Sequence, residues 1–87
     1  MLHAIEAMNT LIEKVRAKRS FPPPEARRNL RERAGLTQHD IAGAIGVDRA
    51  SVARYEAGTR EPSGEVLRKY AEVLDTLTVE LSRKGAA

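Results

Sequence analysis

The feature that most constrains the fold of this 87-residue chain is a glycine turn between two short helical segments, within GLTQHDIAGAIGVDRASVARYEAGTREP at residues 35–62. Gly46 ends the first segment after barely two turns, because glycine readily adopts the left-handed conformation that closes a helix. Thr37 is a good N-cap for that segment, and Asp40 completes a capping box. Asp48 is the N-cap of the second segment. The stretch is therefore predicted to hold two short helices across a tight turn.

The second of these helices, from about residue 48 to residue 57, has two different faces. One carries Val52, Tyr55 and Glu56, and the other carries Arg49, Ala50, Ala53 and Arg54. Arginine can donate forked hydrogen bonds to guanine or to phosphates, and small alanines let a helix lie deep in a groove of DNA. A short helix, a turn and a second helix form the arrangement of helix-turn-helix DNA binding. The alternative is that these arginines only solvate a surface helix.

Residues 1–19 are predicted to form an amphipathic helix. Its apolar residues recur at spacings of three and four, which places them on one face; they are Leu2, Ile5, Met8, Ile12 and Val15. An isolated helix of this length is marginal in water, so the face is expected to pack against something. Two partners remain open at this point, the rest of the chain and a second subunit.

Residues 20–23 are predicted to be a stiff linker, because the three consecutive prolines from Pro22 to Pro24 hold the backbone extended. The alternative is a proline-rich ligand for a partner domain. Pro24 suits the first turn of a following helix, expected to run to about Ala34. We expect Ala26, Leu30 and Ala34 to face inward and Arg27, Arg28 and Arg33 to face mostly outward.

The C-terminal part is predicted to be one long helix from about Gly64 to Ser82, with Ser63 as its N-cap and a frayed end. Its apolar residues follow a three-four repeat without internal glycine or proline; they are Val66, Leu67, Tyr70, Val73, Leu74, Leu77 and Leu81. The three predicted units are thus a helix at 1–19, a linker at 20–23 and a helical domain at 24–84.

The helical domain resembles a known family. The run LRERAGLTQHDIAGAIGVDRASVARYEAGTREPS contains, in order, Leu-Thr-Gln, Ile-Ala, Ile-Gly-Val, Val-x-x-Tyr-Glu-x-Gly and Arg-x-Pro. This set resembles the Xre/Cro/cI-type helix-turn-helix regulators of bacteria and phages, over about residues 24–75. The resemblance implies an all-α, lambda-repressor-like bundle that binds double-stranded DNA. To this bundle the chain adds an N-terminal helix and a long C-terminal helix.

Family roles can be assigned to the positions of this sequence that match. The resemblance implies that the base edges are read by Arg49, Ala50 and Arg54. It places phosphate contacts at Thr37, Gln38, Ser51 and Arg60. It also implies a structural salt bridge between Arg31 and Glu56, which removes Arg31 from the DNA contacts. A helix N-terminus independently favours an anion at Gln38, because it presents free N–H groups and partial positive charge.

Two positions and one segment depart from the family pattern. Arg27 stands where an aliphatic residue is usual, so either Ala26 takes that place or the helix is rotated. Asp75 replaces the glycine that commonly separates the last two helices, which favours one fused helix. The N-terminal extension lies outside the pattern altogether.

Composition narrows the possible functions. The net charge is +3, and most of the 15 basic residues are arginine, which favours a polyanionic partner. The chain has no cysteine, and its two histidines lie far apart without an evident third ligand, so we expect no metal, no cofactor and no enzymatic activity. No stretch is apolar enough to span a bilayer, no small-molecule ligand is evident, and a cytoplasmic, nucleoid-associated protein is expected.

The leading hypothesis is a sequence-specific transcriptional regulator, a repressor or Cro-like switch, that dimerises through its terminal helices. The second hypothesis is an antitoxin or adaptor whose terminal helices bind a different protein, with DNA binding secondary. Native mass alone and after co-purification separates the two.

Overall fold

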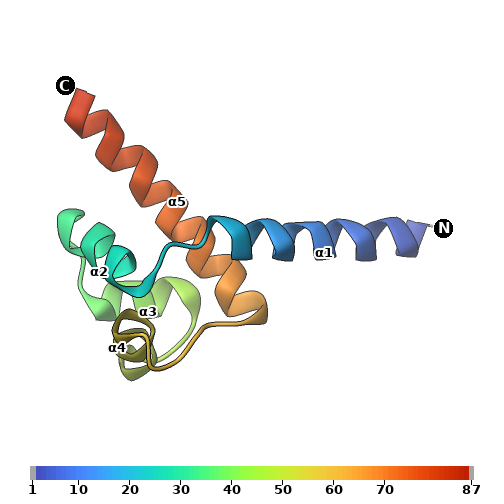
Figure 1. Ribbon diagram of the computed structural model, residues 1–87, viewed down its shortest axis with the longest axis horizontal. Coiled ribbons are helices and arrows are strands. Elements are labelled where there is room, and N and C mark those ends of the chain that lie inside the picture. The colour runs from blue at the N-terminus through green and yellow to red at the C-terminus, as the bar shows by residue number, and fades with distance from the viewer. Residues whose placement is uncertain (1, 87) are drawn as a thin grey trace.

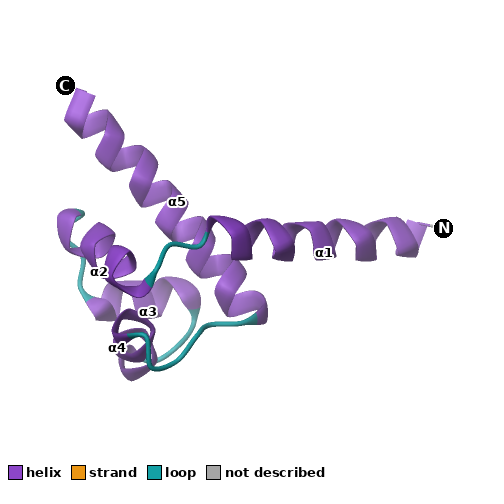
Figure 2. Ribbon diagram, in the orientation of Figure 1, coloured by secondary structure: helices purple, strands orange, loops and turns teal. Residues whose placement is uncertain are grey.

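Five helices make up the described part of the chain, residues 2–86, where no strand occurs (Figure 1, Figure 2). The structure is a computed structural model that describes the backbone of residues 2–86 and the side chains of residues 4–16 and 21–83. The helices are α1 Leu2–Ser20, α2 Pro24–Arg33, α3 Gln38–Ile45, α4 Arg49–Ala57 and α5 Gly64–Ala86. The predicted all-α class, with an additional N-terminal helix and a long C-terminal helix, is confirmed. Within residues 2–86, no helix is both long and apolar enough to cross a membrane.

The short helices begin and end at the predicted residues. Thr37 caps α3, its hydroxyl accepting from the Asp40 amide at 3.0 Å while the Asp40 carboxylate accepts from the Thr37 amide at 2.8 Å. Gly46, at φ 76°, ends α3 in the left-handed conformation. Asp48 caps α4 by accepting from the Ser51 amide at 2.8 Å. The turn between α3 and α4 is thus fixed at one end by the left-handed backbone of Gly46 and at the other by the side chain of Asp48.

The core is formed where α3 and α4 pack together and against α5. It consists of aliphatic residues and two tyrosines that are at most 4% exposed: Ile41, Ala42 and Ile45 of α3, Val52 and Tyr55 of α4, and Tyr70 and Leu74 of α5. Phe21 from the linker adds its ring edge to Tyr70, with the ring centroids 5.2 Å apart. The core therefore leaves one face of α4 free while it fixes the other.

The C-terminal helix is continuous through Asp75, as the missing glycine predicted. The predicted end at about Ser82 falls short, since α5 continues to Ala86. No proline follows Ser82, and one glycine at position 85 costs a helix only about 1 kcal/mol. Arg83 and Glu80, three residues apart, also pair on the surface of this last stretch.

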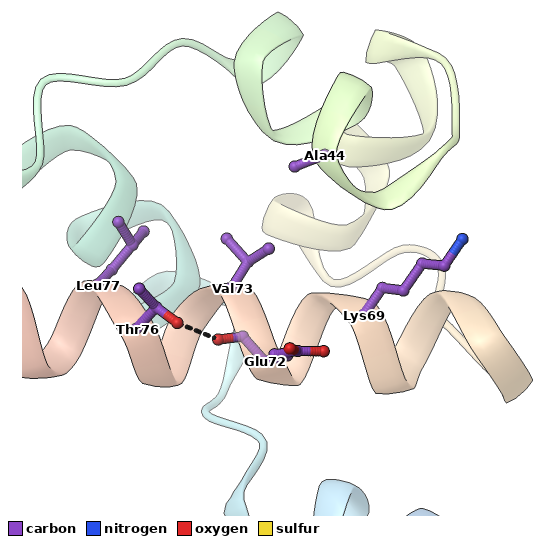
Figure 3. A pocket seen from close by; sticks show the side chains of 6 residues that line it. All are labelled: Ala44, Lys69, Glu72, Val73, Thr76 and Leu77. Carbon is purple, nitrogen blue, oxygen red and sulfur yellow. Dashed lines mark hydrogen bonds between the residues drawn. The ribbon is translucent and has the colours of Figure 1, made fainter.

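A shallow hollow lies between α3 and the middle of α5 (Figure 3). Its lining comes from Ala44, Lys69, Glu72, Val73, Thr76 and Leu77. The Thr76 hydroxyl donates to the backbone carbonyl of Glu72 at 2.9 Å, so its hydrogen is used within α5. Val73 and Leu77 line the hollow as apolar groups, and both also pack against the core. The hollow belongs to the packing of α3 on α5.

The position of Arg27 corrects the sequence analysis, which placed this residue mostly outward. Its side chain is only 4% exposed and donates to the carbonyls of Pro22 at 2.7 Å and Tyr55 at 2.9 Å. The guanidinium also pairs with Glu61 at 3.1 Å and lies 4.2 Å from the centroid of the Phe21 ring. Burial is tolerated because carbonyls, a carboxylate and an aromatic face satisfy the charge. Arg27 therefore faces the interior, at a position where the family resemblance leads one to expect an aliphatic side chain.

The C-terminal end of α1 packs against α5, and the rest of α1 extends away from the molecule (Figure 1). Its apolar face was expected to be covered, and packing within the chain does not achieve this. Ile5 is 57% exposed, Met8 62% and Val15 51%, while Ile12 is the least exposed at 41%. The side chain of Leu2, the first member of the predicted stripe, lies outside the described residues. Packing against α5 within the chain therefore leaves most of this apolar face exposed.

Candidate nucleic-acid interface

Helix α4 presents a face that is basic and slim. Arg49, Ala50 and Arg54 are exposed on it, and Ala53 between them is half-buried. The opposite face is held in the core by Val52, which is fully buried. The helix cannot rotate without exposing that face, so the arginines are held toward solvent. The predicted base-reading residues therefore lie together on one surface.

Arg49 is connected to the N-terminus of α3 by a side-chain bridge. Its Nη1 donates to Oε1 of Gln38 at 3.0 Å. The other end of the same amide, Nε2, donates to Oε1 of Glu56 at 3.1 Å. A predicted phosphate-binding residue thus stands between a predicted base-reading residue and a buried carboxylate. One amide uses both its acceptor and its donor to tie α3 to both ends of α4.

Glu56 is in turn held by Arg31, the partner that the family resemblance implied. The pair is forked, with Nε to Oε2 at 2.6 Å and Nη2 to Oε1 at 3.0 Å, and the two side chains are only 12% and 3% exposed. Donation to Glu56 raises the pKa of Arg31 above its ordinary value. Arg31 also donates to the carbonyl of Leu36 at 2.9 Å, which fixes the loop before α3. The salt bridge therefore supports the position of Gln38.

The start of α3 remains suited to an anion although its capping box is formed. The Thr37 hydroxyl accepts from the Asp40 amide and also bonds the Asp40 carboxylate, so it can donate to an anion only by turning away from that carboxylate. The backbone hydrogen bond from Thr37, followed by one from its side chain, lowers the pKa of Asp40. Gln38 is half-buried, with its amide at the α3–α4 junction. Gln38 thus lies beside Arg49 at the edge of the basic face, and Thr37 precedes it in the chain.

Ser51 and Arg60, the other two predicted phosphate contacts, differ in exposure. Ser51 is only 8% exposed, and hydrogen bonds from its side chain and then its amide lower the pKa of Asp48. The side chain predicted to reach a phosphate therefore lies mostly buried beside the Asp48 cap of α4. Arg60 is exposed in the loop after α4. Its neighbour Glu61 pairs with the buried Arg27, which anchors that loop.

Two contributions to this surface were missed by sequence reasoning. The bond between Gln38 and Glu56 joins residues 18 positions apart, and no local spacing indicates it. The anchoring of the Arg60 loop by Arg27 was missed because an arginine in an amphipathic helix is normally read as outward. Its unusual place in the family pattern was the available signal. Within the described residues, no group of three or more His, Cys, Asp or Glu side chains could hold a metal ion.

A family model described as helix-turn-helix matches residues 28–81, more than half of the chain and all of α3, α4 and the turn between them. No curated protein and no solved structure matches the chain. The matched segment includes the bridge from Arg49 through Gln38 to Glu56.

Proposed function

The chain belongs to the Xre/Cro/cI-type helix-turn-helix family, and from this premise we propose that it is a sequence-specific regulator of transcription that places α4 in the major groove of double-stranded DNA. It acts as a repressor or Cro-like switch by occupying an operator. The observation that carries the proposal is the exposure of Arg49 and Arg54 on either side of a slim alanine surface, on a helix fixed by its buried face.

In this proposal the α4 face reads bases. Arg49 and Arg54 donate to the O6 and N7 acceptors of guanines, and the methyl group of Ala50 contacts a base edge, most favourably the methyl of thymine. Each well-formed bidentate arginine contributes about 1–3 kcal/mol of discrimination against a wrong base. The bridge to Gln38 supports this role, because it restricts Arg49 before DNA arrives.

The rim of the same surface holds the DNA backbone. Thr37 and Gln38 are placed at the start of α3, where partial positive charge favours a phosphate. Arg60 approaches from the loop after α4, and Ser51 serves if its hydroxyl turns from Asp48 to a phosphate. These contacts set orientation and general affinity, while the base contacts set specificity.

The active form in this proposal is a homodimer joined through the terminal helices. A single small module buries about 600–1,000 Å² on DNA, and two modules on half-sites one helical turn apart multiply that contact. The site of action is the cytoplasm, on the nucleoid. Neither a cofactor nor a small-molecule ligand takes part.

The test is an unbiased selection of oligonucleotides bound by the full chain, followed by titration of the selected duplex and a shuffled duplex at several salt concentrations. We expect one enriched motif and a log–log salt dependence of about −0.9 for each phosphate neutralised. In a reporter strain, the motif placed over a promoter should lower expression. The proposal fails if no motif is enriched, or if binding is flat with salt.

A further inference from the structure

The exposed apolar face of α1 is large for a soluble protein. Leu11, which the predicted stripe omitted, is 61% exposed and lies beside Met8 and Val15 on the helix surface. Together with Ile5 and Ile12, these side chains form a continuous apolar surface, on the order of the largest patch found on monomers, about 300–600 Å². A face of this kind is an interaction surface rather than a scatter of exposed residues. We call these five residues the α1 stripe.

We infer that the α1 stripe pairs with the same stripe of a second copy of this chain, the two α1 helices running antiparallel. This orientation follows from the spacing of four of the five stripe residues, all except Leu11. Ile5, Met8, Ile12 and Val15 follow steps of three, four and three, a pattern that reads the same in both directions about position 10. A two-fold axis at that point places Ile5 of one copy against Val15 of the other, and Met8 against Ile12. One surface patch is thereby complementary to itself, as a two-fold dimer requires.

The charge along α1 favours the antiparallel orientation over the parallel one. Glu6 is the only formally charged side chain in residues 1–10, whereas Lys14, Arg16, Lys18 and Arg19 gather in the second half. Parallel helices would bring the two basic halves together, and antiparallel helices separate them. The helix dipoles also oppose each other in the antiparallel pair.

A hollow beside the stripe offers space for the second copy. It lies between α1 and the start of α5, with Leu11 and Val15 on one side and Leu67 on the other. Most of its exposed lining is apolar, and the first half of the antiparallel α1 would approach it. A stable interface buries about 800 Å² per partner. The one stripe that each partner contributes supplies part of that area, and the Leu67 side of the hollow adds to it.

The segment that follows the C-terminal end of α1 is fixed to the domain, so α1 can hold a constant orientation relative to the domain. Arg27 donates to the carbonyl of Pro22 at 2.7 Å, and Phe21 packs edge-on against Tyr70. In an antiparallel pair centred on position 10, the two C-terminal ends at Ser20 are about 30 Å apart, since a helix rises 1.5 Å per residue. That separation is on the scale of the roughly 34–36 Å between half-sites one turn apart. The inference rests on the homodimer of the proposed function and specifies its interface.

The first test measures the mass of the full chain by sedimentation equilibrium. The wild type should have twice the 9.6 kDa chain mass. Met8→Glu should weaken self-association at least about 100-fold, because it places a charge in the centre of the apolar contact. Thr10→Glu is the matched control on the opposite face of the same helix and should remain dimeric, with both variants equally helical. A monomeric wild type, or dimers of equal strength for both variants, overturns the inference.

The second test uses cysteine cross-linking, since the chain has no cysteine of its own. Ile5→Cys and Val15→Cys should each give little disulfide dimer alone, and their mixture should give the mixed disulfide in high yield. Efficient cross-linking of each variant with itself would instead show a parallel pair and overturn the antiparallel arrangement. Failure of the mixture to cross-link would also overturn it.

The DNA measurements separate this inference from the proposed function. Met8→Glu should retain the preference for a single selected half-site and lose the cooperative gain on two half-sites. A stable wild-type dimer that binds no DNA would leave the α1 interface standing and remove the regulator proposal. A wild type that binds the motif as a monomer, or whose α1 is occupied by a different protein at one-to-one ratio, would remove the α1 pairing and leave DNA recognition in place.

Discussion

The guanidinium of Arg49 donates a hydrogen bond to the side-chain oxygen of Gln38 across 3.0 Å, which joins the first residue of α4 to the first residue of α3. Gln38 is itself held by the nearly buried carboxylate of Glu56, and Glu56 by Arg31. The exposed Arg49 is thus anchored, through Gln38, by the nearly buried Glu56. An arginine held in this way loses less side-chain entropy when it meets a base.

Arg49→Ala and Gln38→Ala should therefore weaken DNA binding in different ways. In the proposed complex, loss of Arg49 removes a base contact, so preference at one or two base pairs should fall by about 1–3 kcal/mol. Loss of Gln38 removes a phosphate contact and frees Arg49, so binding should weaken across all sequences, with a smaller loss of discrimination. Binding arrays that contain every single-base variant of the selected motif measure both effects.

The control for charge alone is Arg83→Ala, which removes one positive charge near the far end of α5. This variant should bind within about twofold of the wild type, as expected for a distant exposed charge. An Arg49→Ala protein that loses the same affinity on every sequence would assign Arg49 to the phosphates and leave base reading to Arg54.

The helix-turn-helix unit was predictable from sequence because its information is local. Thr37, Asp40 and Gly46 specify the ends of α3 through capping and backbone conformation, and neighbouring residues alone decide these features. Asp75 likewise predicted a continuous α5, because a non-glycine residue gives the helix no reason to stop there. The family motif then placed Arg49 at the start of the exposed basic face.

The contacts that were not predictable depend on the packing of distant segments. Periodicity identified an apolar face on α1 and could not identify what covers it. Arg27 is buried because Pro22 of the linker, Tyr55 of α4 and Glu61 of the following loop meet around it. Arginine is usually exposed, so the residue type alone predicted an exposed side chain for Arg27. Contacts between residues far apart in sequence were therefore not predictable from the local pattern of the sequence.

The buried pair of Arg31 and Glu56 gives a prediction for stability. Arg31→Met should lower the free energy of unfolding by about 3–5 kcal/mol, because it leaves the Glu56 carboxylate buried without its charge partner. The double variant Arg31→Met, Glu56→Leu should recover at least about 2 kcal/mol of that loss, since two apolar side chains fill the same space. Urea unfolding followed by circular dichroism measures both values.

The same double variant tests whether Glu56 positions Gln38. DNA binding by a folded double variant should still be weaker than that of the wild type, because Gln38 has lost its acceptor. Wild-type affinity in the folded double variant would show that the bridge has no part in recognition. A double variant no more stable than Arg31→Met would argue against a buried-charge penalty.

Arg27 and Glu61 should contribute unequally to the free energy of unfolding, although they form an ion pair. Arg27→Lys loses the forked geometry that reaches the carbonyls of Pro22 and Tyr55, and it should cost about 1–3 kcal/mol of unfolding free energy. Glu61→Gln should cost less than about 1 kcal/mol, because the Glu61 side chain is 61% exposed and the solvent screens its charge. Thermal and urea unfolding of the two variants compare these losses, and equal losses would assign the role of Arg27 to the ion pair rather than to the carbonyls.

Tyr70 is the largest fully buried side chain of the core, between the rings of Phe21 and Tyr55. Its hydroxyl has no hydrogen-bond partner among the described residues. Burial, and after it the charge of Glu56, raises the pKa of Tyr70 to about 12. The folded protein therefore keeps this phenol neutral at pH values where the unfolded chain ionises it.

The stability of Tyr70→Phe should differ from that of the wild type in alkaline solution. The folded pKa lies above the unfolded value of 10.0, so this group leaves stability undiminished below pH 10 and lowers it as the pH rises toward 12. The wild type should lose roughly 2 kcal/mol over this range that the phenylalanine variant does not lose. At pH 7 the variant should be equally stable or more stable by about 1 kcal/mol, because it removes an unsatisfied hydroxyl. Urea unfolding from pH 7 to 12 measures the difference; parallel curves for the two proteins would show that the Tyr70 hydroxyl ionises as freely in the folded state as in the unfolded chain.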